Sequence, residues 1–351
     1  MKVEFDLNKI VRSNVAKLKA YSSARDEFEE ATANMVFLDA NENPFQNGVN
    51  RYPDPKQQSV KQLLSKIKDV PTNQILLGNG SDEVLDLIFR AFCEPKQDNV
   101  VLLPPTYGMY GVLAGLNDVT TKEVLLSDKF DIRVQETLDI VDDNSKLLFL
   151  CSPNNPSGNS FSSVKIERII KSFNGIVVVD EAYIDFSSDE SWSKRLNDFP
   201  NLIVTQTLSK AYGMAGIRLG ICYASPEIIE ILNRIKPPYN VNELTQQKAK
   251  ERLMKFDEVQ TEIRSILAER IRLEKQLEAI SFITKIFTSD ANFLLVKVDN
   301  ANERYNELIA KGIVIRNRTT QPLCENTLRL TIGTRTENNK LIEALKELDN
   351  D

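Results

Sequence analysis

Residues 176–180 read IVVVD, a continuous apolar run that ends in an acidic residue. A continuous run, in contrast to an alternating one, is typical of a strand buried on both faces of a mostly parallel sheet. Helical patterns separate this run from others like it, so the sequence predicts an α/β doubly wound core. The other runs are ILL (75–77), VVLL (100–103), KLLFLC (146–151) and LIVTQ (202–206).

The clearest helical pattern covers residues 81–92, where apolar side chains recur on one face. Ser81 is expected to be its N-cap, and Asp82 and Glu83 in the first turn suit the positive end of a helix. The sequence therefore predicts a strand, a glycine-containing turn and a helix in succession.

The pattern changes after KPPYN (236–240). Residues 241–280 lack glycine and proline and predict a long helical region with room for one break. The expected elements beyond it form a smaller α+β domain: strand 291–298, helix 301–312, strand 313–318, strand 327–333 and helix 336–348. We expect an N-terminal arm (1–40), a large domain (41–255) and a small domain (256–351).

Size and composition narrow the function. A chain of 351 residues suits about two domains. The net charge of −6 argues against a protein that grips nucleic acid or an anionic membrane. No apolar stretch resembles a signal peptide or a membrane span, and the four cysteines form no CxxC pair, so a cytoplasmic protein with reduced thiols is expected.

The chain contains no histidine. This excludes a Ser-His-Asp triad, a Cys-His pair and nearly every histidine-containing metal site, so no metal is expected. Proton transfer must fall to Lys, Tyr, Asp, Glu or Cys, or to a cofactor.

Two motifs follow predicted strands. GNGSDE (78–83) opens the predicted helix, and its glycines and free N–H groups favour a phosphate. It lacks the third glycine of a dinucleotide fingerprint, and a plain tight turn explains it equally well. SPNNPSGN (152–159) predicts a fixed backbone at a strand end, where ligands bind in open α/β sheets, and Pro156 is a candidate for a cis peptide.

Asp180 and Lys210 stand out chemically. Asp180 ends a buried strand, so a positively charged partner is expected nearby. The carboxylate serves either in a structural ion pair or helix cap, or in holding a protonated ring nitrogen. Lys210 lies among small residues in TLSKAYGMAGIRLG (207–220), which lowers the pKa of its amine and favours a nucleophile. Thr207, Ser209 and Arg218 add donors for a phosphate. Together these elements describe a site for pyridoxal phosphate.

These motifs, with DANENPF (39–45), NRYPD (50–54) and PPTYGMYG (104–111), resemble the fold type I pyridoxal-phosphate aminotransferases. Within that group the chain is most similar to the histidinol-phosphate aminotransferases, from about Tyr21 to Arg335. The resemblance implies a large domain with a mixed, mostly parallel sheet, a smaller α+β domain and an N-terminal arm. It also implies a homodimer with shared active sites.

The resemblance further implies a ping-pong reaction of histidine biosynthesis. Histidinol phosphate and 2-oxoglutarate become imidazole-acetol phosphate and glutamate. Lys210 links to the cofactor aldehyde and moves the proton, while Asp180 pairs with the ring nitrogen. Asn155 and Tyr183 hydrogen-bond the phenolic oxygen, and Tyr107 stacks on the ring.

The family pattern also places the remaining site residues. The phosphate contacts fall on Gly80, Ser81, Asp82, Thr207, Ser209 and Arg218, with Tyr52 reaching the phosphate of the neighbouring subunit. The substrate contacts fall on Tyr21, Asn41, Arg316 and Arg329, of which Arg329 is the carboxylate clamp.

Other functions remain open at this point. An aromatic or broad-specificity aminotransferase and a phospho-amino-acid decarboxylase both retain Lys210 and Asp180. A nicotinamide-dependent dehydrogenase rests on GNGSDE alone and leaves Lys210 unexplained. A non-catalytic binding protein on the same scaffold has no need of Lys210.

Overall fold

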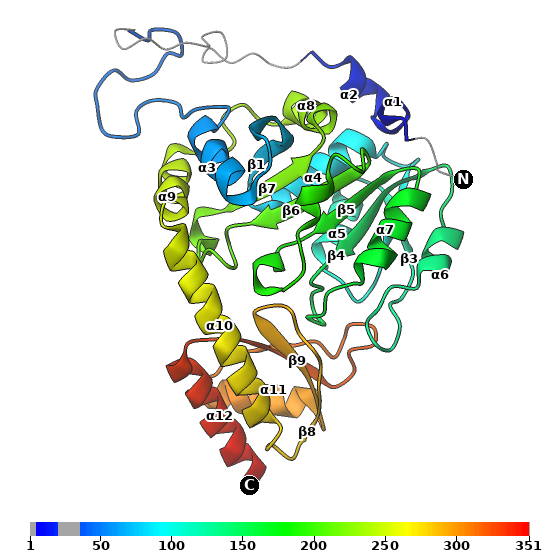
Figure 1. Ribbon diagram of the computed structural model, residues 1–351, viewed down its shortest axis with the longest axis vertical. Helices are drawn as coiled ribbons and strands as arrows, with labels where there is room; N and C mark the ends of the chain where they lie inside the picture. The colour runs from blue at the N-terminus through cyan, green and yellow to red at the C-terminus, as the bar shows by residue number, and fades with distance from the viewer. Residues whose placement is uncertain (1–4, 20–35, 351) are drawn as a thin grey trace.

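The computed structural model describes residues 5–19 and 36–350. Within these residues the larger sheet has seven strands in the order β1-β7-β6-β5-β4-β2-β3 (Figure 1). Strands β6, β5, β4, β2 and β3 are parallel, and β7 is antiparallel to both of its neighbours. The strands are β1 (Ile75–Asn79), β2 (Asn99–Leu102), β3 (Thr120–Glu123), β4 (Ser145–Cys151), β5 (Ile176–Asp180), β6 (Leu202–Thr207) and β7 (Leu219–Ala224).

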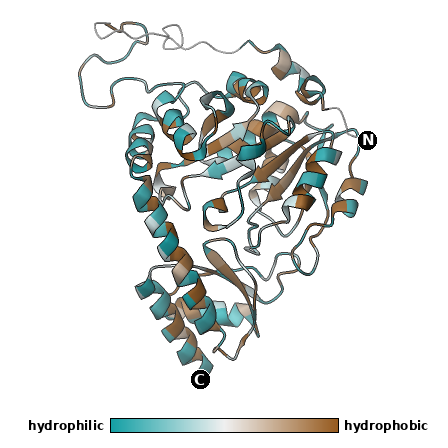
Figure 2. Cartoon of the chain, in the orientation of Figure 1, coloured by the Kyte–Doolittle hydropathy of each residue, from teal (hydrophilic) through white to brown (hydrophobic). Residues whose placement is uncertain are grey.

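The five apolar runs of the sequence lie in β1, β2, β4, β5 and β6, which confirms the mixed, mostly parallel α/β sheet. Successive residues of β5 pack on opposite faces. Val177 and Val179 join a hydrophobic cluster with α3 (Gln58–Lys68) and α7 (Ser163–Ser172). Ile176 and Val178 join another with α4 (Ser81–Phe92), α5 (Met109–Leu116) and α8 (Pro226–Ile235). Because helices cover both faces, an unbroken apolar strand is required (Figure 2).

The start of α4 differs from the prediction. Its N-cap is Gly80, at φ 82°, and Ser81 is the first helical residue. The positive φ suits glycine and turns the chain from β1 into the helix. Glu83 accepts hydrogen bonds from the backbone N–H of Asn79 and from Nδ2 of Asn240, at 2.8 Å for the latter. A side chain from the first turn therefore reaches back to stabilise the end of β1.

The C-terminal part contains a second sheet, antiparallel throughout, with the order β10-β11-β9-β8. The long helical region is broken once, between α9 (Glu243–Leu253) and α10 (Phe256–Leu277). The predicted strand 313–318 is shorter than expected, because only β10 (Arg316–Asn317) pairs with β11. The other elements are β8 (Ile283–Ile286), β9 (Phe293–Val298), α11 (Ala301–Ala310), β11 (Thr327–Thr331) and α12 (Arg335–Asn350).

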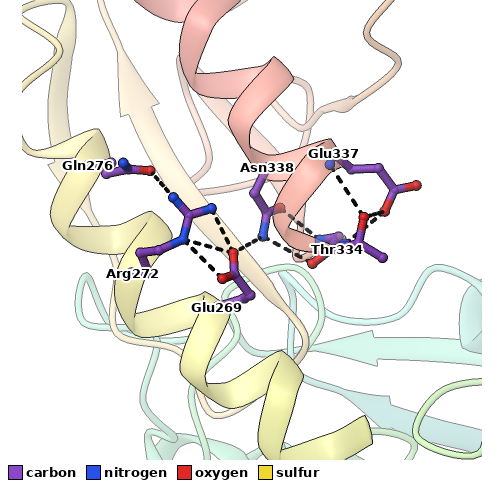
Figure 3. A network of polar contacts seen from close by, with 7 residues as sticks. Glu269, Arg272, Gln276, Thr334, Glu337 and Asn338 are labelled. Carbon is purple, nitrogen blue, oxygen red and sulfur yellow. Dashed lines mark hydrogen bonds and ion pairs between the residues drawn. The ribbon is translucent and has the colours of Figure 1, made fainter.

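A polar network joins α10 to the start of α12 (Figure 3). Glu269 accepts hydrogen bonds from Arg272 Nη2, at 2.7 Å, and from Asn338 Nδ2, at 3.0 Å. The side-chain carbonyl of Asn338 also accepts a bond of 2.9 Å from the backbone N–H of Gly333, just after β11. These bonds fix the long helix against the second sheet.

The remaining elements are short. They are α1 (Leu7–Ile10), α2 (Ser13–Lys17), α6 (Val134–Asp139) and the 3₁₀ helices Thr72–Gln74, Ile184–Phe186, Trp192–Arg195 and Ala215–Ile217. All four cysteines are buried and free. Among the residues that the structure describes, no helix combines the length and the apolar composition needed to cross a bilayer.

Candidate active site

The carboxyl ends of β4, β5 and β6 open onto one cavity, which also touches the start of α4. We call it the Lys210 cavity. Ten residues singled out from the sequence line it: Ser81, Asp82, Tyr107, Asn155, Asp180, Tyr183, Thr207, Ser209, Lys210 and Arg218. Cys151, Ala182 and Ala215 complete the described lining. Segments from five separate parts of the chain meet here, because the parallel strands end at the same edge of the sheet.

Asp180 is the most buried acid of this cavity, with 3% of its surface exposed. Its carboxylate accepts hydrogen bonds from the Tyr110 hydroxyl, at 2.7 Å, and from the backbone N–H of Ala182, at 3.2 Å. Burial raises the pKa of Asp180, and these bonds oppose that shift. No cationic side chain of the described residues forms an ion pair with it, which differs from the expectation of a structural cation.

Tyr110 was missed by the sequence reasoning. It lies one helical turn after Tyr107 in PPTYGMYG, near the start of α5, and its ring packs edge-on against that of Tyr107 at 5.5 Å between centroids. The spacing of three residues was the available signal, because the turn that leads into α5, closed by a bond of 3.3 Å from the Tyr110 N–H to the Tyr107 carbonyl, brings both rings together.

Lys210 follows β6, and its Nζ lies 5.7 Å from the centroid of the Tyr183 ring. Its side chain is solvent-exposed at the cavity. Neighbouring protein atoms remove water from the amine and lower the pKa of Lys210, and the positive charge of Arg329 lowers it further. The carboxylate of Asp180 acts in the opposite direction. The amine is therefore more available in its neutral, nucleophilic form than an ordinary lysine.

The wall of the Lys210 cavity beside α4 carries several hydrogen-bond donors. Arg218 Nη2 lies 3.6 Å from a carboxylate oxygen of Asp82, and the Thr207 hydroxyl donates to Ser209 Oγ at 2.9 Å. A Cβ at Gly80 would lie 2.6 Å from Arg218 Nη2. The guanidinium of Arg218 therefore keeps its position only because residue 80 is glycine. The open N–H groups at the start of α4 point to the same wall and favour an anion.

Tyr107 and Asn155 are held by charged neighbours. The Tyr107 hydroxyl donates to Asp82 at 3.1 Å, and Asn155 Oδ1 accepts from Arg329 Nη1 at 2.5 Å. The peptide between Asn155 and Pro156 is cis, which confirms the sequence prediction.

Three arginines gather at the second sheet. Arg316 lies opposite Arg329 in the pairing of β10 with β11, and Arg318 follows two residues later. Burial lowers the pKa of Arg329 to about 10, with Arg318 as the next cause. The Nε atoms of Arg318 and Arg329 are buried without a hydrogen-bond partner in the described chain. Arg318 was missed, although alternation in IRNR places it on the same strand face as Arg316.

Asn41 and Tyr52 do not line the Lys210 cavity of their own chain. They line a separate pocket, in which Asn41 has φ 55°. The Tyr52 ring stacks on the Tyr239 ring at 4.4 Å between centroids. Glu42 holds this segment by accepting a bond of 2.6 Å from the Tyr52 backbone N–H. Tyr21 lies outside the described residues.

Comparison with known proteins gives a consistent result. Residues 23–345 match the family model for aminotransferase class I and II. The chain is 63% identical over 346 residues to the histidinol-phosphate aminotransferase of Flavobacterium johnsoniae, which covers 98% of this chain and 99% of that protein. The solved histidinol-phosphate aminotransferase from Clostridium acetobutylicum has a TM-score of 0.78 and 25% identity, covering 86% of this chain and 91% of that chain.

A second solved structure adds to the comparison. It is the histidinol-phosphate aminotransferase from Sinorhizobium meliloti in complex with pyridoxal-5'-phosphate. Its TM-score is 0.78 at 23% identity, and the match covers 86% of this chain and 83% of that one. At this identity the likeness shows the fold.

Proposed function

The chain belongs to the aminotransferase class I and II family and, within it, to the histidinol-phosphate aminotransferases, and from this premise we propose that Lys210 and Asp180 carry its chemistry. It is a pyridoxal-phosphate-dependent transaminase of histidine biosynthesis. The reaction converts histidinol phosphate and 2-oxoglutarate into imidazole-acetol phosphate and glutamate. The observation that carries the residue assignment is the buried carboxylate of Asp180, which forms no ion pair with the described residues and lies in the same cavity as the amine of Lys210.

The residues present fit pyridoxal phosphate. A buried carboxylate is unfavourable without a positive partner, and a protonated pyridine nitrogen supplies one to Asp180. The start of α4 and Arg218 suit a phosphate dianion, with the hydroxyls of Thr207 and Ser209 beside them. An amine whose pKa is lowered, as at Lys210, suits an aldehyde.

When bound, the cofactor supplies an electron sink for charge developing at the substrate carbon that carries the amino group. Asp180 would keep the ring nitrogen protonated, and Tyr110 holds that carboxylate in place. Lys210 would take the proton from the substrate carbon that bears the amino group and deliver it to C4′ of the cofactor. Asn155 and Tyr183 would hold the phenolic oxygen, and Tyr107 would cover the ring face.

We assign substrate binding to the arginines of the second sheet. Arg329 donates a hydrogen bond to Asn155, which lines the Lys210 cavity, so its guanidinium lies at the edge of that cavity. Arg316 and Arg318 add positive charge beside it, which favours the substrate phosphate in one half-reaction and a carboxylate of 2-oxoglutarate in the other. Tyr21 and Asn41 are proposed to complete this site.

A homodimer with shared active sites is also proposed. Tyr52 lines a pocket apart from the Lys210 cavity of its own chain, which supports a role in the neighbouring subunit. The segment before it exposes large apolar side chains, with Val36, Leu38 and Phe45 each at least 80% exposed. Apolar groups so close together favour a protein contact. Sedimentation equilibrium tests this, and a monomeric holoenzyme would contradict it.

The division into an arm (1–40), a large domain (41–255) and a small domain (256–351) remains a proposal. It is supported by a second sheet with its own hydrophobic cluster, built from α10, α11, α12 and the strands β8–β11.

The absorbance of the bound cofactor tests the function. Histidinol phosphate should convert it fully in a single turnover, whereas phenylalanine and threonine phosphate should react far more slowly. Fast conversion by phenylalanine would indicate a broad-specificity aminotransferase, and release of carbon dioxide from threonine phosphate would indicate a decarboxylase. Borohydride reduction of the holoenzyme should fix a label on Lys210, and a label elsewhere would refute the residue assignment.

A further inference from the structure

A second cavity is lined by residues of α3, of α8 and of the start of β1, and it shares no lining residue with the Lys210 cavity. Three lysines line it: Lys56, Lys61 and Lys236. The rest of its described lining is Pro55, Gln58, Thr72, Asn73, Ile75, Pro226, Ile229, Glu230, Asn233 and Pro238. We call it the Lys61 pocket.

Lys61 is unusual because a lysine is rarely buried without a partner. Only 7% of its surface is exposed, and within the described chain its ammonium forms no hydrogen bond and no ion pair. Burial lowers the pKa of Lys61 to about 8, and Lys236 is the next cause. Asp54 is the nearest opposing charge, but its carboxylate accepts the backbone N–H groups of Lys56 and Gln58, at 2.8 and 2.6 Å.

The other charged side chains of the pocket have partners of their own. The ammonium of Lys236 donates to Asn240 Oδ1 at 3.1 Å and to the Pro237 carbonyl at 3.2 Å. The carboxylate on the described wall is Glu230, and it pairs with Arg234 at 2.7 Å. Neither side chain therefore supplies a partner to the ammonium of Lys61.

We propose that the Lys61 pocket binds a phosphate group, either as the free anion or as part of a small organic phosphate. A dianion placed among the three ammonium groups supplies the partner that Lys61 lacks. Thr72, Asn73 and Asn233 offer neutral donors around it, and Ile75 and Ile229 form an apolar wall for an organic portion. The pocket is thus a site separate from that of cofactor and substrates.

Calorimetric titration of the holoenzyme with inorganic phosphate tests this. Saturating 2-oxoglutarate covers the arginines of the second sheet, and the bound cofactor fills its own phosphate position. The wild type should bind phosphate, and Lys61→Met should weaken binding at least about tenfold, because a charged hydrogen bond is lost. The control is Lys66→Met, which removes an exposed lysine of the same helix and should bind as the wild type does.

The pH dependence identifies Lys61 as the responsible group. Phosphate is a dianion throughout the alkaline range, so its affinity for the wild type should fall above about pH 8, where Lys61 loses its proton. Lys61→Arg keeps its charge there and should retain binding with no such fall. A structural role alone would not produce this difference.

Ribose 5-phosphate, titrated in parallel, distinguishes the two sources of the phosphate. Tighter binding than inorganic phosphate would indicate an organic phosphate that uses the apolar wall, and equal affinity would indicate the free anion. Absence of phosphate binding to the wild type, for instance because a second copy of the chain fills the pocket, overturns the proposal. Equal binding by the wild type and Lys61→Met overturns it as well.

Discussion

Lys210 and Lys61 are two lysines whose pKa is lowered chiefly because neighbouring protein atoms displace water from the amine, yet their surroundings differ. Lys210 shares its cavity with the carboxylate of Asp180 and with hydroxyls and an arginine that suit a phosphate. Lys61 shares its pocket with two further lysines. A lowered pKa therefore does not define a function. The neighbouring groups decide whether a lysine serves as a nucleophile or as a receptor for an anion.

Lys68 sharpens the contrast, because it lies on α3 two turns after Lys61. Its ammonium forms an ion pair with Asp185 at 2.7 Å, and both side chains are largely buried. Burial alone would lower the pKa of Lys68, but the carboxylate of Asp185 raises it well above its usual range. One helix thus carries a buried lysine with a carboxylate partner and one without.

The largest effect is expected at Lys210. Lys210→Ala removes the group that moves the proton, so kcat for histidinol phosphate should fall by at least about a thousandfold. Steady-state assays with 2-oxoglutarate measure this, and circular dichroism checks that the variant folds. Lys61→Ala is the matched control, since it removes a buried lysine outside the Lys210 cavity. A Lys210→Ala enzyme within about tenfold of the wild type would refute the assignment.

The next effect concerns stability. Lys68→Met leaves Asp185 buried without its partner, and breaking a buried pair in this way costs about 3–5 kcal/mol in the free energy of unfolding. Urea unfolding of the holoenzyme measures the difference. Lys194→Met is a suitable control, because its partner Asp69 is 90% exposed and such pairs contribute about 0–1 kcal/mol. Equal losses in both variants would contradict the view that Lys68 is a paired, buried charge.

The strands that are buried on both faces of the sheet were predicted from the sequence. The runs that became β4, β5 and β6 are apolar without interruption because helices cover both faces of the sheet. β3 (TTKE) was not predicted, since this edge strand is polar and partly exposed. β7 (LGICYA) was hidden in the glycine-rich stretch after Lys210, where its pairing with β1 and β6 depends on distant residues.

The site residues also fall into those that the sequence predicted and those that it did not. Lys210, Asp180 and Asn155 stand directly after predicted strands, so their meeting follows from the parallel sheet. Tyr110 was missed because its role depends on which face of α5 turns inward. Arg318 was missed because it lies just beyond β10, where the sequence does not show that its side chain is half-buried. The burial of Lys61 could not be predicted from the sequence, because it depends on how α3 packs in the fold and not on the residues beside Lys61 in the chain.

A smaller effect should appear at Lys61 as the pH rises in phosphate-free buffer. The pKa of Lys61 is lowered from 10.5 to about 8 in the folded protein, so the unfolded chain binds more protons between these values. Stability therefore rises with pH in that window. Relative to Lys61→Met, the wild type should gain about 2 kcal/mol from about pH 7 to about pH 9.5. A constant difference between the two unfolding free energies would show that Lys61 keeps an ordinary pKa.

The smallest effect concerns the group that makes the two cavities different, the carboxylate of Asp180. Tyr110→Phe removes the hydroxyl that donates to it at 2.7 Å. Burial then raises the pKa of Asp180 with less opposition, so the carboxylate holds a protonated ring nitrogen less firmly. The dissociation constant of pyridoxal phosphate should rise about tenfold and kcat should fall by a similar factor, since hydrogen bonds to charged groups contribute about 1.5–3 kcal/mol. KM for histidinol phosphate should change little.

Fluorescence titration of the apoprotein measures the cofactor affinity independently of turnover. Tyr223→Phe is the control, because the Tyr223 hydroxyl is buried without a hydrogen-bond partner in the described chain and its loss should be nearly neutral. If Tyr110→Phe binds the cofactor as tightly as Tyr223→Phe does, the backbone N–H of Ala182 and the ring nitrogen suffice to hold Asp180. The contrast with the Lys61 pocket would then rest on the presence of a carboxylate and not on how that carboxylate is positioned.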